Sequence, residues 1–437
     1  MTTVATPAAP GPVAPRTLQE AGLSRDLVTQ LVLKTLHLAG ELTGTELARR
    51  LGLSFFAIEP VLQTIKQQHQ CEVSGGALGS PTFRYRITDI GRSRAMLFME
   101  HNQYVGQAPV PLAQYREYMA AFQKTARRFV GRADVREAFS HLVIGERVLN
   151  QLGPAINAGH SMFVYGPPGN GKTVISQAIR NLLDGEIFIP HALEVEGSII
   201  RFFDPVNHEP VRGQEQSELL DLAGETDARW VRCRRPMVMV GGELSLGQLE
   251  LSYSPTMGFY RAPVQAIANG GVLVIDDFGR QTCSPRDLLN RWIVPLESRV
   301  DFLTLQTGQK FDFPFMTLVV FATNIKPQDL VDEAFLRRIQ YKIFAESPTK
   351  AEFLQIFENC CRDKGLDYRP EVIENLLATY YRPRQIQLRG CQPRDLINQA
   401  ISLAEYYGEP AALTPSVLEA ACASYFVDDR EAPPEYA

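Results

Sequence analysis

The chain has 437 residues, enough for two or three domains at roughly 150 residues each. Hydrophobic residues make up 45%, charged residues make up 21%, and the formal net charge is -5. This composition is typical of soluble globular proteins, and the net charge gives no overall attraction to nucleic acid or anionic membranes. No apolar run approaches the roughly 20 residues that cross a bilayer, and the N-terminus does not resemble a signal peptide. We therefore expect a cytoplasmic protein without membrane insertion.

The cysteines give no sign of a metal site. They are Cys71, Cys233, Cys283, Cys360, Cys361, Cys391 and Cys422. None forms a Cys-x-x-Cys pair, so the sequence indicates neither a zinc site nor a framework of disulfides. We expect reduced thiols, as in cytosolic proteins.

The first part of the chain predicts a small helical domain. Residues 1–16 are rich in Ala and Pro, and we expect them to be a disordered tail, as we do for residues 428–437. Apolar spacing then predicts a helix around 27–38, and Thr43 begins a capping box for a second helix. A third helix follows, in which Pro60 marks either a kink or a later start.

A glycine-rich turn through Gly75, Gly76 and Gly79 separates two predicted strands, and a closing helix begins near residue 88. Three helices followed by a two-stranded wing resemble a winged helix, which we place at residues 17–102. Such domains bind DNA or partner proteins. Residues 17–101 contain nine cations and eight anions, and the expected recognition helix carries only Lys66. Because phosphate contacts supply much of the affinity for DNA, protein docking is favoured over DNA binding.

Residues 103–135 are expected to be a linker, extended around 107–111 and then helical to about Arg128. After it, an apolar run at 161–165 predicts a buried strand, followed by a phosphate-loop pattern and a helix. The pattern consists of Gly166, Pro167, Pro168, Gly169, Asn170, Gly171, Lys172 and Thr173. Its glycines let backbone N–H groups surround phosphate oxygens, Lys172 places a charge on the β- and γ-phosphates, and the Thr173 hydroxyl ligates Mg²⁺.

A second buried strand carries acidic residues. Residues 272–275 are apolar and lead into Asp276 and Asp277, which indicates a central strand of a parallel sheet. At the carboxyl end of that sheet, Asp276 is expected to hold Mg²⁺ and Asp277 to orient the attacking water. A third buried strand, 317–322, leads to Asn324, which we expect beside Asp276, in reach of the γ-phosphate or the water.

These motifs and their order resemble an AAA+ ATPase over about residues 136–427. The resemblance implies an α/β fold, a P-loop NTPase parallel sheet at 136–347 with a C-terminal helical lid at 348–427. It implies ATP and Mg²⁺ as cofactors, with Val143, Ile144 and Val174 joining the loop in nucleotide binding. It also assigns the arginine finger to Arg337 or Arg338 and the lid's sensor arginine to Arg394. Most relatives carry Glu where this chain has Asp277, which leaves slow hydrolysis open.

The region between the acids and the third strand suggests a branch of the family. A hairpin predicted at 300–313 resembles that of MoxR-like chaperones and helicase-type motors. Phe259 and Tyr260 are either pore-loop residues or ordinary packing, and Arg229, Arg232, Arg234 and Arg235 either contact nucleic acid or a neighbouring subunit, or lie on a solvated strand.

The sequence thus predicts a ring-forming ATPase, expected to be a hexamer, that remodels a protein client recruited by the winged helix. One alternative is a DNA-directed motor, loader or regulator. Another is a nucleotide-gated scaffold that hydrolyses ATP slowly.

Overall fold

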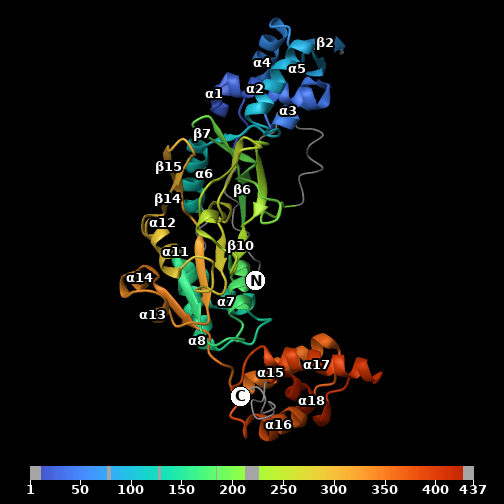
Figure 1. Ribbon diagram of the computed structural model, residues 1–437, viewed down its shortest axis with the longest axis vertical. Coiled ribbons are helices and arrows are strands. Elements are labelled where there is room, and N and C mark those ends of the chain that lie inside the picture. The colour runs from blue at the N-terminus through green and yellow to red at the C-terminus, as the bar shows by residue number, and fades with distance from the viewer. Residues whose placement is uncertain (1–10, 76–79, 126–128, 184, 212–225, 427–437) are drawn as a thin grey trace, which may run out of the picture. The chain divides into compact units, whose positions relative to one another are not determined.

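The computed structural model describes residues 11–75, 80–125, 129–183, 185–211 and 226–426 (Figure 1). The predicted glycine turn at 76–79, the predicted helix end at 126–128 and most of the two predicted tails lie outside these residues. Residues 11–16 are described, and they contact the fold: Pro12 O accepts from Asp227 N at 2.8 Å and Pro15 O from Ser54 Oγ at 3.0 Å. The prediction of a disordered tail is therefore wrong for these six residues.

The chain divides into two compact units. The first comprises residues 1–129, 183–275 and 280–319, and the second comprises residues 130–182, 276–279 and 320–437. The domain boundaries drawn from the sequence stay a prediction.

The first unit opens with a small helical region. Its elements are α1 Leu18–Ala21, α2 Arg25–Ala39, β1 Glu41–Thr43, α3 Gly44–Leu51, α4 Phe55–Gln67, β2 Cys71–Gly75, η1 Ser80–Thr82, β3 Arg84–Ile87 and α5 Asp89–His101. The three strands form an antiparallel sheet in the order β1-β3-β2. Thr43 and Glu46 form the predicted capping box at the start of α3. Pro60 lies inside α4, so the later start that we had considered for this helix is wrong.

The rest of the first unit is mostly strands. Its elements are β4 Val110–Pro111, α6 Leu112–Thr125, β6 Glu186–Pro190, β7 Ala192–Val195, β8 Ser198–Arg201, β9 Trp230–Arg234, β10 Met237–Val240, η3 Leu246–Leu249, β11 Ser252–Ser254, β12 Phe259–Arg261, α10 Val264–Ile267, β13 Val272–Ile275, α11 Pro285–Arg291, α12 Ile293–Ser298, β14 Val300–Thr304 and β15 Lys310–Pro314. β14 and β15 pair as the predicted hairpin. A five-stranded sheet has the order β11-β12-β8-β7-β4, and β6 pairs with β9.

Three expectations for this region change. The segment predicted as a linker contributes α6, whose Tyr115, Met119 and Phe122 are buried among aromatic neighbours and so belong to the core. Phe259 and Tyr260 are each only 5% exposed, because the two faces of β12 pack against different core clusters. They are packing residues, and their assignment to a pore loop is wrong. Arg229, expected on a surface, is buried in an ion pair with Asp227.

The second unit contains the phosphate loop and the C-terminal helices. Its elements are α7 Arg132–Ala138, α8 Glu146–Ala158, β5 Ser161–Tyr165, α9 Lys172–Ala178, η2 Ile179–Leu182, β16 Leu318–Thr323, α13 Pro327–Leu330, α14 Glu333–Arg338, β17 Tyr341–Phe344, α15 Lys350–Lys364, α16 Pro370–Leu376, the π-helix η4 Leu377–Tyr381, α17 Gln392–Tyr407 and α18 Pro415–Tyr425. From α15 onward the unit is helical, as the sequence predicts.

The main sheet has the strand order β10-β13-β16-β5-β17. β10 and β13 are parallel, as are β17 and β5, and all residues of β13 and β16 are buried. Strands buried on both faces are typical of parallel sheets covered by helices. The predicted α/β fold class is therefore confirmed. Within the described part of the chain, no helix is long and apolar enough to cross a membrane.

Candidate nucleotide-binding site

The phosphate loop follows β5 and ends where α9 begins at Lys172. Its shape depends on glycine at two positions. Gly169 has φ of 79°, and a Cβ there would lie 2.5 Å from Cys391 Sγ. Gly166 has φ of 149°, and a Cβ there would lie 2.5 Å from Ala345 O. Side chains at either position would push the loop away from its neighbours, so these glycines keep backbone N–H groups available for a ligand.

Lys172 is bound by its own loop. Its Nζ donates to Gly166 O at 3.1 Å and to Pro167 O at 2.8 Å, and the residue is 7% exposed. Burial lowers the pKa of Lys172, while the charges of Asp277 and Asp276 oppose that shift. Neutral carbonyls are weak partners for a buried ammonium, and an anionic phosphate placed there would be a stronger one. The lysine is thus in position to bind an anion.

Thr173 and Asp276 come together although they are 103 positions apart. Thr173 Oγ1 donates to Asp276 Oδ2 at 2.7 Å, so the first turn of α9 and the end of β13 present a hydroxyl and a carboxylate to one point. Hard oxygen ligands of this kind fit Mg²⁺, which takes one or two protein oxygens and completes its shell with water and phosphate. The two residues predicted as metal ligands are therefore adjacent.

Asp277 has an unusual backbone. Its φ is 47°, in the left-handed region, and its N–H donates to Asp276 Oδ1 at 3.0 Å. Asn324, expected beside Asp276, donates through Nδ2 to Oδ1 of the next acid, Asp277, at 3.1 Å. Thr323, which the sequence did not single out, accepts from Gly166 N at 3.3 Å and donates through Oγ1 to Phe278 O at 2.7 Å. It connects the phosphate loop to the acidic turn.

The helices that follow β17 also contact the phosphate loop. Cys391 N donates to Gly169 O at 2.8 Å, and Gly390 N donates to Asn170 Oδ1 at 3.3 Å. Asn170 Nδ2 donates to Ser347 Oγ at 3.2 Å. Asn170 was predicted only as part of the loop, and its three-way role has no local sequence signal, because its partners lie 177 and 220 positions away.

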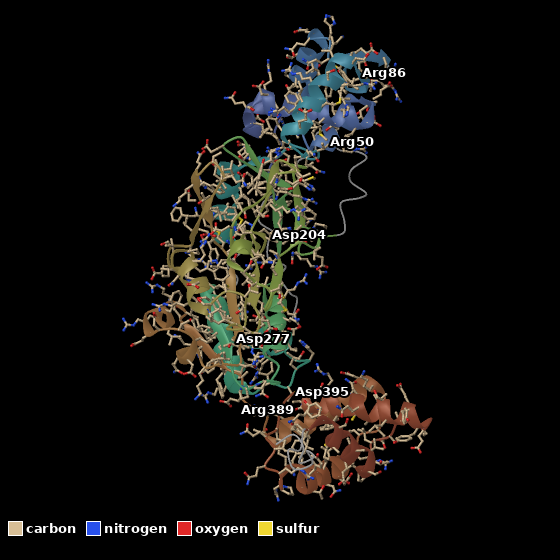
Figure 2. The ribbon with its side chains drawn as sticks, viewed as in Figure 1. Arg50, Arg86, Asp204, Asp277, Arg389 and Asp395 are labelled. Carbon is tan, nitrogen blue, oxygen red and sulfur yellow. The ribbon has the colours of Figure 1, made fainter. Side chains whose placement is uncertain are left out.

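Arg389 is a second residue that the sequence reasoning missed. It is labelled in Figure 2 and precedes α17. Its Nη1 donates to Ser347 Oγ at 3.4 Å. After burial, the charge of Arg389 is the other influence that lowers the pKa of Lys172, so this arginine acts on the lysine electrostatically. A signal existed in the sequence, since Arg389-Gly390 directly precedes the predicted start of the helix.

The remaining predicted residues keep their assignments as predictions. Arg394 lies in the first turn of α17, as expected, and its guanidinium pairs with Asp395 at 2.9 Å. Arg337 and Arg338 end α14, where Arg337 pairs with Glu333 and Arg338 stacks on Phe335. Val143 and Ile144 are half-buried in the segment before α8. Pro167, Pro168 and Gly171 complete the loop, and Val174 is exposed on α9.

Comparisons with known proteins give little beyond this. A family model described as a domain of unknown function (DUF8689) matches residues 349–424. No curated protein matches the sequence. Solved structures that resemble the chain include the RuvB Holliday junction branch migration motor of Thermotoga maritima. The two chains are 14% identical, the match covers 67% of this chain and 73% of that chain, and the TM-score is 0.38. NtrX from Brucella abortus in complex with ADP has 15% identity, 79% and 67% coverage, and a TM-score of 0.39.

Likenesses this distant carry no information on activity. What stands on the chain's own geometry is its architecture: an α/β protein whose parallel sheet carries a phosphate loop at the end of β5, with two adjacent carboxylates at the end of β13.

Proposed function

We propose that the chain is a Mg²⁺-dependent AAA+ ATPase. The observation that carries the proposal is the 2.7 Å hydrogen bond between Thr173 Oγ1 and Asp276 Oδ2. A chance phosphate-loop sequence would have no reason to place its threonine on the acid of a distant strand, whereas a nucleotide site requires that pair to share a metal ion.

Each residue then has a chemical task. Lys172 exchanges its loop carbonyls for the β- and γ-phosphates, and the loop amides donate to phosphate oxygens. Thr173 and Asp276 would hold Mg²⁺, which would supply positive charge to the phosphates. Asp277, held by Asn324, orients the attacking water. Arg337 or Arg338 of a neighbouring subunit stabilises the charge on the transferring phosphate, and Arg394 of the lid contacts the same group.

A ring assembly, with a hexamer as the expected form, follows from the in-trans arginine. Both arginines end a short helix, and the Arg337 side chain is 78% exposed, which leaves it accessible to a neighbouring copy. Hydrolysis in such a ring moves the lid against the α/β core and remodels the client.

We assign recruitment of a protein client to a winged-helix domain at residues 17–102. The support is the element order of α2, β1, α3, α4, β2 and β3 with its three-stranded sheet. On α4, the expected recognition helix, Phe56 is 67% exposed, and α5 exposes Ile90 and Leu97. Exposed apolar side chains favour contact with protein, whereas a DNA reader presents cations.

The nucleotide proposal is tested with Lys172→Ala. ATP affinity, measured by calorimetry with Mg²⁺, is expected to fall at least about a hundredfold, because several charge-assisted contacts are lost. Lys364→Ala is the matched control, since Lys364 is exposed in the last turn of α15. Unchanged ATP affinity in Lys172→Ala would remove the assignment.

The client is tested with Asp277→Ala, which should bind ATP and not turn it over. If this variant retains particular proteins in the presence of ATP, and if these proteins stimulate the ATPase activity of the parent, the protein-remodelling function is supported. Stimulation by duplex DNA with a steep salt dependence would instead support a DNA-directed motor. ATP-dependent assembly without multiple turnovers in the parent would support the scaffold alternative.

A further inference from the structure

A second cavity lies within the first unit, apart from the phosphate loop. It has a volume of about 270 Å³ and is lined by Tyr104, Gly106, His191, Arg201, Phe203 and Met257, together with neighbouring residues of the same segments. The loop after α5 forms one wall, and β8, the start of β12 and the residue before β7 form the other. Its volume lies just below the usual range of ligand pockets, so it suits a small ligand.

Arg201 lines this cavity, and a second arginine lies next to it in the sheet. Arg201 ends β8, and its register partner in the parallel strand β12 is Arg261. Register partners project from the same face of a sheet, where like charges destabilise each other. Among the described residues, none accepts a hydrogen bond or forms an ion pair with either guanidinium. Within the described part of the chain, the two cations are thus register partners, and neither has an anionic partner there.

Two titratable side chains that line the cavity, His191 and Tyr104, are neutral at pH 7. Burial, together with the charge of Arg201, lowers the pKa of His191 to about 4, so the ring is neutral at pH 7. Burial also raises the pKa of Tyr104, which the charge of Arg201 opposes. Among the described residues, no carboxylate shifts the pKa of either group. Glu194 lies on the same face of the sheet opposite Ile199, and its Oε1 accepts from Gly197 N at 2.7 Å.

Backbone donors complete the cavity. The loop 103–107 is fixed at both ends, because Gln103 N donates to Met257 O at 2.8 Å and Ala108 N donates to Leu51 O at 2.7 Å. Tyr104 Oη donates to Gln107 O at 2.7 Å, which holds the loop closed on itself. Between these points, the N–H groups of residues 105–107 have no acceptor among the described residues. Backbone N–H groups without a protein acceptor are available as donors to an anion in the cavity.

We propose that this cavity binds a small organic anion, with its phosphate or carboxylate head between Arg201 and the amides of residues 105–107. The aromatic side chain of Phe203 and the thioether of Met257 form the apolar part of the wall, so the ligand carries its charge on a flat or apolar body. Binding would cross-link the segment that leaves the N-terminal helical region with the β8–β12 sheet. This proposal does not depend on the ATPase proposal, since the two sites share no residue.

The test uses the full chain with Lys172→Ala, which removes binding of the probes at the phosphate loop. Phenyl phosphate and benzoate are the probes, and benzamide is the uncharged counterpart of benzoate. Calorimetry is expected to show binding of at least one anion in the millimolar range or tighter. Benzamide should bind at least about tenfold more weakly, because it lacks the charge that Arg201 pairs with. Phenyl phosphate and benzoate separate the phosphate and carboxylate forms of the proposal.

Arg201→Gln in the same background should weaken the anion about tenfold or more, while Arg234→Gln, on exposed Arg234 of β9, should leave it unchanged. Without ligand, Arg201→Gln should melt at or above the parent temperature, because it relieves the repulsion from Arg261. Anion binding that survives Arg201→Gln, or no binding of either anion, would overturn the proposal. If Arg201→Gln lowers the melting temperature, Arg201→Lys is tested in its place. The affinity of Arg201→Lys for the anion should be weaker than that of the parent for the anion and stronger than that of the parent for benzamide.

Discussion

The buried pair of Arg229 and Asp227 allows a stability prediction that also decides a functional question. Arg229 Nη2 lies 2.8 Å from Asp227 Oδ2, and both side chains are 2% exposed. The same guanidinium donates to Ala21 O at 2.9 Å and to Gln114 Oε1 at 3.1 Å. The arginine therefore joins the end of α1, the start of α6 and the turn before β9 within the first unit.

Arg229→Met would leave the Asp227 carboxylate buried without its cation and would remove the donor of three further acceptors, Ala21 O, Pro109 O and Gln114 Oε1. Breaking a buried pair in this way costs about 3–5 kcal/mol of unfolding free energy. In the parent, the backbone N–H of residue 229 donates to Asp227 Oδ1 at 3.0 Å. The double variant Arg229→Met with Asp227→Asn removes the unpaired buried carboxylate but keeps a side-chain oxygen at residue 227 as the acceptor of this N–H. We expect it to recover to within about 2 kcal/mol of the parent, since the remaining cost is that of unmade neutral hydrogen bonds.

Urea denaturation can be followed by Trp230, whose backbone lies next to Arg229, in a Trp292→Phe background that removes the only other tryptophan. Arg234→Met, at an exposed position of β9, is the control and should change stability by less than about 0.5 kcal/mol. If Arg229→Met costs less than about 1 kcal/mol, or if the double variant is no more stable than it, the argument from burial fails. An arginine used for nucleic acid or subunit contacts would instead change activity and leave the unfolding curve unaltered.

Three further predictions follow from the second unit and from α2. Asn170→Ala removes the acceptor of Gly390 N, so hydrogen exchange of that amide should speed up while exchange in α18 stays unchanged; unaltered exchange at Gly390 would contradict the contact. Arg337→Ala or Arg338→Ala should lower ATP turnover by about a thousandfold or more with ATP affinity intact. If both variants turn over ATP at the rate of the parent, the assignment of the arginine finger to these residues is wrong. Burial lowers the pKa of Lys34 to about 8, below its unfolded value of 10.5. Between pH 8 and pH 10.5, the unfolded chain therefore binds more protons than the folded chain, so the stability of the parent should rise with pH in this range. Lys34→Met should raise the melting temperature at pH 7 and lose that advantage toward pH 10; an equal gain at both pH values would show that the ammonium is not the cause.

The sequence was sufficient where the signal is local. Strands β5, β13 and β16 were found as apolar runs, and the acids were found because they end β13 at the edge where parallel strands present ligands. The capping box at Thr43 and the hairpin of β14 and β15 were found because each is specified within a few residues. Such features depend on backbone chemistry that neighbouring residues determine.

The features that the sequence did not predict depend on packing between residues far apart in the chain. Arg229 resembles a surface cation in its local sequence, and only contacts with Ala21 and Gln114, 208 and 115 positions away, make it a core residue. Phe259 follows a glycine, as an exposed loop aromatic would, but β12 has a core cluster on each face. The contacts of Asn170 with Ser347 and Gly390 were missed for the same reason.

The backbone conformation at Asp277 explains why this chain has Asp at a position where most AAA+ ATPases carry Glu. The residue has φ of 47°, a conformation in which Asp is enriched because its short carboxylate can bond nearby groups. Here that carboxylate accepts from Asn324, while the residue's own amide donates to Asp276. A glutamate in the same conformation would place its carboxylate one methylene further from Cα and could not keep the bond to Asn324 without a shift of the turn. The shorter acid is therefore matched to the geometry of this turn.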